Sequence, residues 1–238
     1  MNVPLIIAHT GCESTPENTL ESCLAGKDAG AEVLEVDVQA TKDGVCVLHH
    51  DDHPAFSSCT FEELRQGNPL KFEAGRSLVK LKDVLIRFKG TAVSFNLDLK
   101  NDAAALPALK LLESMDMWEQ IYFTGATDLV LNSPFHSRVM WNTPEKLSKL
   151  GSAVYEAAIE EICTRVKQAG CAGINVDFPS CRGSLVRIAH EYGLRVWIYT
   201  LHDITCFKMF ADMGVDAVSV LDVSGAAAIR KQLITDQK

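Results

Sequence analysis

The chain has 238 residues, of which 47% are hydrophobic and 23% are charged, a composition typical of a soluble globular protein. Its net charge of −8 argues against nucleic acids and anionic membranes as partners, and no run of about 18 apolar residues predicts membrane insertion. The eight cysteines contain no Cys-x-x-Cys pair, and the apolar start lacks the basic lead of a signal peptide. We therefore expect reduced thiols in a cytoplasmic protein.

The first forty residues predict a strand, a helix and a second strand. Residues 4–9 form a short apolar run that we interpret as the first strand. Asn18 to Glu21 resembles a capping box, which would open a helix that ends near Gly30. The next strand, residues 32–40, carries the most informative pattern of the chain.

In the strand at residues 32–40, apolar and polar side chains alternate. A period of two puts Glu35 and Asp37 on one face, about 6.5 Å apart along the strand. If the sheet is parallel and both faces are buried, these two anions need cations beside them. The alternative is a solvated edge of an antiparallel sheet.

The following segment is rich in turn residues. A turn signal at residues 42–44 leads into a strand at 45–49, which we expect to pair with the strand before it. Residues 51–77 show no sustained period apart from a short helical piece at 60–65. This segment is rich in loops, and loops often carry functional sites.

Helix and strand patterns alternate from residue 81 to the C-terminus. Together with the first two strands they give eight βα units, which close naturally into a TIM (β/α)₈ barrel formed by a single domain, residues 1–238. A doubly wound open sheet is the alternative, and both folds place ligands at the carboxyl ends of the strands. The expected helices are 81–88, 103–115, a short one near 128, 153–168, 183–192, 204–213 and 224–233, and the expected strands are 92–99, 121–123, 138–141, 172–176, 194–200 and 216–220.

Charged side chains follow or occupy the first three strands of this barrel. His9 ends the first strand, His50 follows the hairpin, and Asn96, Asp98 and Lys100 share one face of the third strand. Neighbouring strands would bring these groups to one mouth together with the two carboxylates of the second strand. Three carboxylates suit Ca²⁺ or Mg²⁺, and two histidines can supply a general base and a general acid.

Each of these residues also has a simpler interpretation. A histidine at a strand end is often a hydrogen-bonded structural residue, Asp98 and Lys100 can form a simple ion pair, and Tyr199 can belong to the core. His49 is expected to be a polar residue on the opposite face from His50. The combination of all of them in one predicted mouth is what favours an active site.

Here the sequence resembles the glycerophosphodiester phosphodiesterases. That family has, in this order, His-Arg-Gly, Pro-Glu-Asn-Thr, Glu-x-Asp, Thr-Lys-Asp-Gly, His-Asp, Glu-x-Lys and a late Trp-Thr-x-Asn. The corresponding segments of this chain are Ala8-His-Thr-Gly11, Pro16-Glu-Asn-Thr19, Glu35-Val-Asp37, Thr41-Lys-Asp-Gly44, His50-Asp51, Asp98-Leu-Lys100 and Tyr199-Thr-Leu-His202.

The resemblance implies a TIM barrel with a small insertion over its mouth, after the second strand at about residues 45–78. It also implies one divalent cation, Ca²⁺ or Mg²⁺, held by Glu35, Asp37 and Asp98, and acid–base catalysis by His9 and His50. The implied reaction is hydrolysis of a small-molecule glycerophosphodiester to sn-glycerol 3-phosphate and an alcohol. In the family it commonly proceeds through attack by the glycerol 2-hydroxyl and a cyclic phosphate.

The chain departs from the family pattern at several positions. Thr10 replaces the phosphate-binding arginine, the segment 11–16 is one residue short, Asp98 replaces a glutamate and Tyr199 replaces a tryptophan. A hydroxyl cannot replace a bidentate guanidinium, so we expect weak activity, strong dependence on Lys100 and a gain from Thr10→Arg. The expected substrate-binding residues are Lys100, Thr10 and Tyr199.

The sequence thus predicts a cytoplasmic, metal-dependent phosphodiesterase that acts on glycerophosphodiesters. The alternatives are a phosphodiesterase with another phosphodiester substrate and a non-catalytic phosphate-binding barrel. The pattern leaves open whether the chain forms a homo-oligomer.

Overall fold

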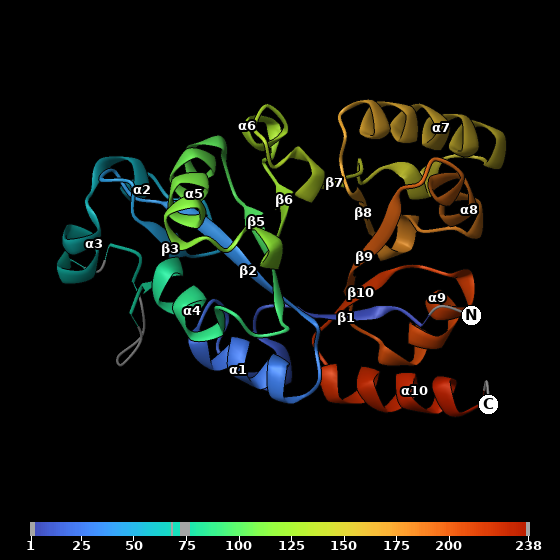
Figure 1. Ribbon diagram of the computed structural model, residues 1–238, viewed down its shortest axis with the longest axis horizontal. Helices are drawn as coiled ribbons and strands as arrows, with labels where there is room; N and C mark the ends of the chain where they lie inside the picture. The colour runs from blue at the N-terminus through green and yellow to red at the C-terminus, as the bar shows by residue number, and fades with distance from the viewer. Residues whose placement is uncertain (1–2, 68, 72–76, 237–238) are drawn as a thin grey trace.

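Eight parallel strands lie at the centre of the protein, as the computed structural model shows for residues 3–67, 69–71 and 77–236 (Figure 1). The strands are β1 (Leu5–Ala8), β2 (Val33–Ala40), β5 (Ser94–Leu99), β6 (Ile121–Gly125), β7 (Met140–Asn142), β8 (Gly173–Asp177), β9 (Arg195–Leu201) and β10 (Ala217–Val220).

The order of these strands is that of a TIM barrel, as predicted, and differs from that of an open doubly wound sheet. β1 lies between β2 and β10; β5 and β6 follow on the side of β2, and β9, β8 and β7 follow on the other side. An isolated parallel bridge between Phe123 of β6 and Val139, the residue before β7, joins the two ends of the series. In Figure 1, β7 to β10 form the yellow-to-red half of the molecule.

Helices connect the parallel strands and cover the barrel (Figure 1). In α4 (Leu81–Phe88), the buried residues Leu81, Val84, Leu85 and Phe88 recur at helical spacing, so one face of the helix packs on the sheet. The other helices of the barrel are α1 (Leu20–Asp28), α5 (Asp102–Met115), α6 (Asp128–Leu131), α7 (Ser152–Gln168), α8 (Gly183–Glu191), α9 (Phe207–Met213) and α10 (Val223–Asp236). Short 3₁₀ helices lie at Cys12–Ser14, Trp118–Gln120, His136–Arg138, Leu147–Lys149, Phe178–Ser180 and Ile204–Cys206.

An insertion follows β2. It begins with strand β3 (Cys46–Leu48), which pairs antiparallel with β2, and ends with strand β4 (Val79–Lys80), which pairs antiparallel with β3. Its helices are α2 (Ala55–Ser58) and α3 (Phe61–Gly67), of which the sequence predicted only the second. The predicted extent, 45–78, also includes residues 68 and 72–76, which lie outside the described residues. The insertion has its own apolar cluster, formed by Val47, Ala55, Phe56, Phe61, Leu64 and Leu78.

A separate apolar cluster closes the interior of the barrel at one end. Val33, Met140 and Ala217 are the first residues of their strands, and they pack with Ile7 and Trp197. The opposite end, at the carboxyl ends of the strands, is where TIM barrels carry their active sites.

In the described residues, no helix combines the length and the apolar character needed to cross a bilayer.

All eight cysteines are unpaired, and six of them are buried. Burial raises the pKa of the Cys46 thiol to about 12, so this cysteine is a packing residue and not a reactive thiolate.

Candidate active site

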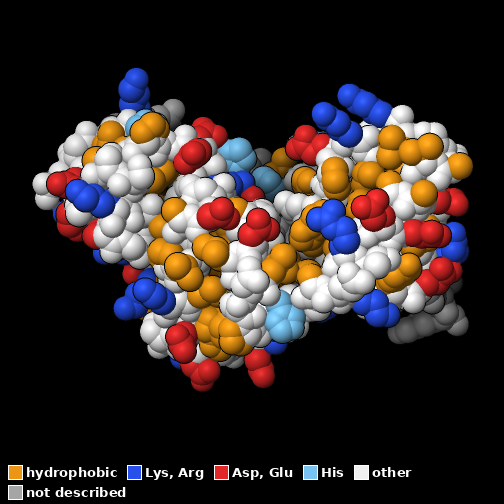
Figure 2. All heavy atoms as spheres, turned by 90° about the horizontal axis from the view of Figure 1, so that it is seen from above, with side chains coloured by type: hydrophobic (Ala, Val, Ile, Leu, Met, Phe, Trp, Pro, Cys, Tyr) orange, Lys and Arg blue, Asp and Glu red, His pale blue; other side chains and the backbone are white. Residues whose placement is uncertain are grey.

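A cavity of about 260 Å³ opens at the carboxyl ends of the strands. Histidine side chains are visible in Figure 2 where the two halves of the surface meet. The cavity is lined by every site residue that the sequence predicted except Thr10, namely His9, Glu35, Asp37, His50, Asp98, Lys100 and Tyr199. The fold therefore brings together side chains that are far apart in the sequence.

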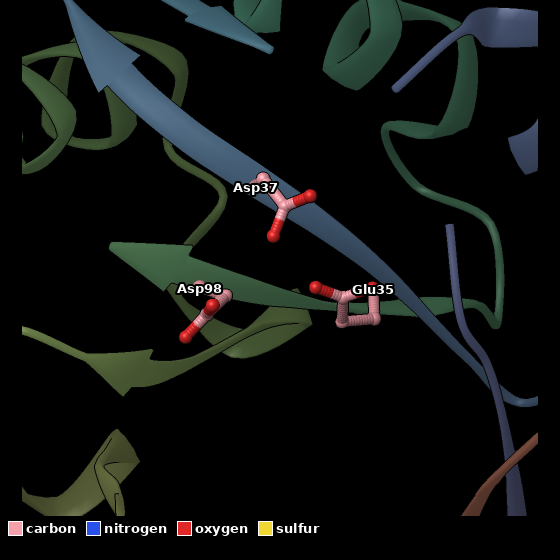
Figure 3. Close-up of side chains that lie close together, drawn as sticks. All are labelled: Glu35, Asp37 and Asp98. Carbon is pink, nitrogen blue, oxygen red and sulfur yellow. The ribbon is translucent and has the colours of Figure 1, made fainter. Parts of the chain in front are cut away.

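The three predicted metal ligands lie on two neighbouring strands (Figure 3). Glu35 and Asp37 project from β2 and Asp98 projects from β5, with Asp37 and Asp98 paired in register. One ligand oxygen from each residue lies within 4.8 Å of those of the other two. Three clustered carboxylates form the oxygen-rich, negatively charged donor set that Ca²⁺ and Mg²⁺ prefer, so the residues present fit such an ion.

Lys100 compensates part of this negative charge. Its Nζ lies 2.6 Å from Asp37 Oδ1 and 2.5 Å from Asp98 Oδ2. Burial acts to lower the pKa of Lys100, but the two carboxylates raise it by more, so the net shift is upward. The ammonium group thus stays charged between the two aspartates.

Glu35 has no lysine or arginine within ion-pair distance among the described residues and is almost completely buried, with 8% of its surface exposed. Burial, followed by the charges of Asp37 and Asp98, raises the pKa of its carboxyl group well above the ordinary 4.5. The backbone N–H of Thr10 and the charge of Lys100 act in the opposite direction. A bound cation would relieve the repulsion that raises this pKa.

The shift predicts how stability depends on pH when no cation is present. Between pH 4.5 and the raised pKa, the folded state keeps the Glu35 proton that the unfolded state has released. The free energy of unfolding should therefore fall as pH rises through this window. Thermal unfolding of chelator-treated protein should show this slope, and Glu35→Gln should reduce it; an equal slope in both proteins would contradict the assignment.

Adding Ca²⁺ or Mg²⁺ to the same chelator-treated protein should raise its melting temperature. At about 100 times the dissociation constant, an ion that binds only the folded state adds about 2.7 kcal/mol. The gain should be larger at high pH, where Glu35 is ionised. No shift with either ion at millimolar concentration would contradict a cation site at these carboxylates.

His9 presents one ring nitrogen to the cavity. Its Nδ1 lies 2.7 Å from the carbonyl oxygen of Thr10, and because a carbonyl only accepts, Nδ1 carries the proton. In the neutral ring Nε2 is then an acceptor, and it lies 3.9 Å from Glu35 Oε2. His9 can therefore accept a proton inside the cavity.

His50 lies at the exposed rim, with 62% of its side chain accessible. Its Nδ1 lies 2.8 Å from Asp51 Oδ1, which leaves Nε2 available to hold or release a proton. The preceding residue, His49, packs edge-on against Phe56 and does not line this cavity. Of the two adjacent histidines, His50 alone lines this cavity, although the Nδ1 atoms of both contact Asp51.

Thr10 lies in a different place from the one that the sequence suggested. Its side chain is buried, with 2% of the residue exposed, and its Oγ1 accepts a hydrogen bond from the backbone N–H of Asn18 at 2.5 Å. Thr10 does not line the cavity, and its hydroxyl is engaged with the loop at Asn18. An arginine here would lack the hydroxyl oxygen that accepts the Asn18 N–H.

The expected capping role of Asn18 is wrong. Asn18 does not cap α1; the side chain of Thr19 does, by accepting a hydrogen bond from the backbone N–H of Ser22 at 3.1 Å. Asn18 has φ of 57°, a left-handed conformation that asparagine tolerates better than most residues. Its amide instead contacts Asp37. The signal for this contact was that the family pattern contains both Pro-Glu-Asn-Thr, which includes Asn18, and Glu-x-Asp, which includes Asp37.

Neutral polar side chains lie around the lower part of the cavity. Thr124 Oγ1 lies 3.0 Å from Asp98 Oδ1 and 3.1 Å from Asn96 Nδ2. Asn175 Nδ2 donates to Asn142 Oδ1 at 2.9 Å, and the buried Ser219 Oγ has no hydrogen-bond partner among the described residues. These groups can donate to or accept from an uncharged ligand that carries hydroxyls.

Tyr199 lines the opposite side of the cavity. Burial, and then the charges of Asp177 and Glu145, raise the pKa of its phenol to about 12. The phenol therefore stays neutral at physiological pH and keeps its proton as a hydrogen-bond donor.

Gly125, at the end of β6, allows the close approach of Asp98. Its φ is +77°, and an added Cβ would lie 2.3 Å from the carbonyl oxygen of Leu99 and 2.6 Å from Asp98 Oδ1. We expect Gly125→Ala to lower the free energy of unfolding by more than about 1 kcal/mol and to weaken cation binding. Gly44→Ala is the matched control, because φ is +76° there but the space is open. Equal losses of stability and unchanged cation affinity in both variants would contradict this role.

Residues 9–223 match the model of the glycerophosphoryl diester phosphodiesterase family. A glycerophosphodiester phosphodiesterase from Bacillus altitudinis is 30% identical over 145 residues, which cover 55% of this chain and 58% of that protein.

Two solved structures show the same fold. A glycerophosphodiester phosphodiesterase from Parabacteroides distasonis superimposes with a TM-score of 0.79 at 20% identity, over 98% of this chain and 99% of that one. A phosphodiesterase from Oleispira antarctica, solved in complex with the product sn-glycerol-3-phosphate, has a TM-score of 0.71 at 20% identity, over 98% and 97% of the two chains. With the family match over residues 9–223, the chain belongs to the glycerophosphoryl diester phosphodiesterase family.

Proposed function

We propose that this protein is a phosphodiesterase that depends on Ca²⁺ or Mg²⁺ and hydrolyses glycerophosphodiesters to sn-glycerol 3-phosphate and an alcohol. The observation that carries this proposal is the carboxylate cluster Glu35, Asp37 and Asp98, which lines one cavity together with His9 and His50. The family membership and the product complex of the Oleispira antarctica protein support the same reaction here.

The three carboxylates would hold the cation, which when bound would polarise a phosphoryl oxygen and offset its negative charge. Among the described residues that line the cavity, Lys100 is the only lysine or arginine. The substrate phosphate therefore relies on Lys100 for its direct contact with a cationic side chain. Loss of Lys100 should accordingly have a large effect on turnover.

The two histidines can divide the proton transfers. His9 Nε2 accepts the proton of the attacking hydroxyl as the new phosphorus–oxygen bond forms. His50, at the open rim beside Asp51, donates a proton to the alcohol oxygen as the old bond breaks. If the attacking group is the glycerol 2-hydroxyl, as the family resemblance implies, water then opens the cyclic phosphate with the two roles exchanged.

The neutral part of the cavity favours a glycerol group over an apolar one. Asn96, Thr124, Asn175 and Ser219 offer amides and hydroxyls beside the carboxylates, and apolar side chains dominate only below them. Glycerol hydroxyls can exchange hydrogen bonds with such groups. The cavity volume of about 260 Å³ supports a small-molecule substrate.

The unpaired cysteines support a location in the cytoplasm.

A second candidate is hydrolysis of a different phosphodiester. The observation that favours it is that a buried threonine, Thr10, stands in the place of the family arginine. Among the described residues that line the cavity, no other arginine supplies the missing guanidinium. The two candidates differ in the group that fills the neutral part of the cavity.

A substrate panel tests the proposal. The purified chain is incubated with Mg²⁺ or Ca²⁺ and glycerophosphocholine, glycerophosphoethanolamine or bis(4-nitrophenyl) phosphate, and the products are identified by ³¹P NMR. We expect sn-glycerol 3-phosphate from the first two substrates. Hydrolysis of the nitrophenyl ester alone would favour the second candidate, and no hydrolysis of any substrate by folded protein would contradict a phosphodiesterase.

A further inference from the structure

Two residues of the loop between β1 and α1, Thr10 and Asn18, form hydrogen bonds with the buried carboxylates of β2. Thr10 donates its backbone N–H to Glu35 Oε2 at 3.0 Å. Asn18 donates its side-chain N–H to Asp37 Oδ2 at 2.8 Å, and its Oδ1 accepts the backbone N–H of Asp37 at 3.0 Å. Each carboxylate thus has one oxygen fixed by a neutral donor.

The other oxygens remain directed toward the cluster. Lys100 Nζ contacts Asp37 Oδ1, the oxygen that Asn18 does not bind. Figure 3 shows one oxygen of Glu35 pointing toward Asp37 and Asp98. The two oxygens of a carboxylate therefore have separate tasks, since one anchors the group and one faces the place where a cation would bind.

The two anchoring residues are themselves joined. Thr10 Oγ1 accepts the backbone N–H of Asn18 at 2.5 Å, and both residues are buried, with 2% and 8% of their surfaces exposed. This bond satisfies a buried backbone donor at a residue whose φ is 57°. Without it, the left-handed conformation that aims the Asn18 amide at Asp37 would lose one of the hydrogen bonds that hold it.

We propose that Thr10 and Asn18 form a positioning pair that presets Glu35 and Asp37 for the cation, and that the Thr10 hydroxyl serves this pair and does not bind substrate. The inference rests on the proposed cation-dependent function. It gives the threonine that stands in the place of the family arginine a role of its own in this chain.

The physical basis is the cost of orienting repelling carboxylates. Oxygens of Glu35, Asp37 and Asp98 lie within 4.8 Å of one another, so ionised side chains that were free to rotate would move apart when the ion is absent. Hydrogen bonds from neutral donors hold the group in place and leave its charge for the ion. Loss of such outer partners lowers metal affinity about 10- to 100-fold in characterised metal sites.

Two matched pairs of variants test this inference in the full-length chain stripped of metal. Thr10→Val keeps the shape of the side chain but removes the acceptor, whereas Thr10→Ser keeps the hydroxyl. Asn18→Gly permits the left-handed backbone but removes the amide, whereas Asn18→Asp keeps the shape but replaces the donor with a third buried anion beside Asp37. The measurements are Ca²⁺ and Mg²⁺ dissociation constants by isothermal titration calorimetry, and melting temperatures without added ion.

We expect Thr10→Val and Asn18→Gly to bind the cation about 10- to 100-fold more weakly than the wild type. Asn18→Asp should lower the melting temperature measured without added ion, because it places another anion beside Asp37. Thr10→Ser should bind within about threefold of the wild type, which a merely space-filling role of Thr10 would not predict. If Thr10→Val and Asn18→Gly fold and bind the cation as tightly as the wild type, the positioning role is wrong while the proposed function stands. If the wild type itself binds neither ion, both the cation requirement and this inference fail.

A second measurement covers the case in which Thr10→Val does not fold. Asn18→Gly then carries the test alone, because its backbone conformation is allowed for glycine. Activity at saturating cation should recover in part, since the residues that contact the substrate are unchanged. A loss of kcat that no cation concentration reduces, with normal cation affinity, would also overturn the inference.

Discussion

Replacing His9 with alanine should lower kcat at least about 100-fold, and replacing His50 should do the same. This is the scale of general acid–base catalysis by a positioned side chain. His9 Nε2 faces the carboxylate cluster, and the Thr10 carbonyl fixes the tautomer that makes it an acceptor. His50 Nε2 has the proton-donating position at the rim, oriented by Asp51.

The control for these two variants is the neighbouring histidine. His49→Ala removes a ring that packs on Phe56 and does not line the cavity, so kcat should change little. Folding of all three variants is checked by melting temperature, and kcat is measured with glycerophosphocholine. A large loss in His49→Ala with wild-type activity in His50→Ala would contradict the assignment of the rim residue.

Replacing Asp98 with asparagine should have a comparable effect through the cation. The change keeps the shape of the side chain but removes one of three negative charges, so both cation affinity and turnover should fall. The electrostatic contribution of a catalytic metal is worth several kcal/mol, which corresponds to more than about 100-fold in kcat/KM. Raising the cation concentration should restore only part of the activity, because a neutral amide is a poorer ligand for a hard ion.

Asp102→Asn is the matched control for this variant. Asp102 opens α5, four residues after Asp98, and its side chain is exposed outside the cavity. It should keep the wild-type cation affinity and lose no more than the modest stability of a charge near a helix N-terminus. Equal cation affinity in Asp98→Asn and Asp102→Asn would exclude Asp98 as a ligand.

The strand pattern predicted eight βα units, with an open doubly wound sheet as the alternative to the barrel, and it predicted the faces of the second and third parallel strands. Alternation in β2 and β5 places Glu35, Asp37 and Asp98 on the interior face, because side-chain direction in a strand depends only on the period of two. Lys100 follows directly after β5 and also lines the cavity. The eightfold repetition of strand and helix then fixes which ends of the strands meet. These properties are local or periodic, so the sequence carries them directly.

The surroundings of Thr10 and Asn18 could not be predicted in this way. Their positions depend on the path of the loop between β1 and α1, where Glu13, Ser14 and Asn18 all have positive φ. No periodic pattern specifies such a path, and a capping box at Asn18 was an equally good local interpretation. The same reason explains the short α2 helix in the insertion, which four residues cannot signal by periodicity.

The most direct test of the whole account is the cation dependence of hydrolysis in one protein preparation. The chain is stripped with chelator, assayed with glycerophosphocholine for release of sn-glycerol 3-phosphate, and assayed again after Ca²⁺ or Mg²⁺ is added in excess. The account predicts no measurable release before addition and sustained release after it. Undiminished hydrolysis in chelator, or none with either ion in protein shown to be folded, would contradict a cation-dependent phosphodiesterase built on Glu35, Asp37 and Asp98.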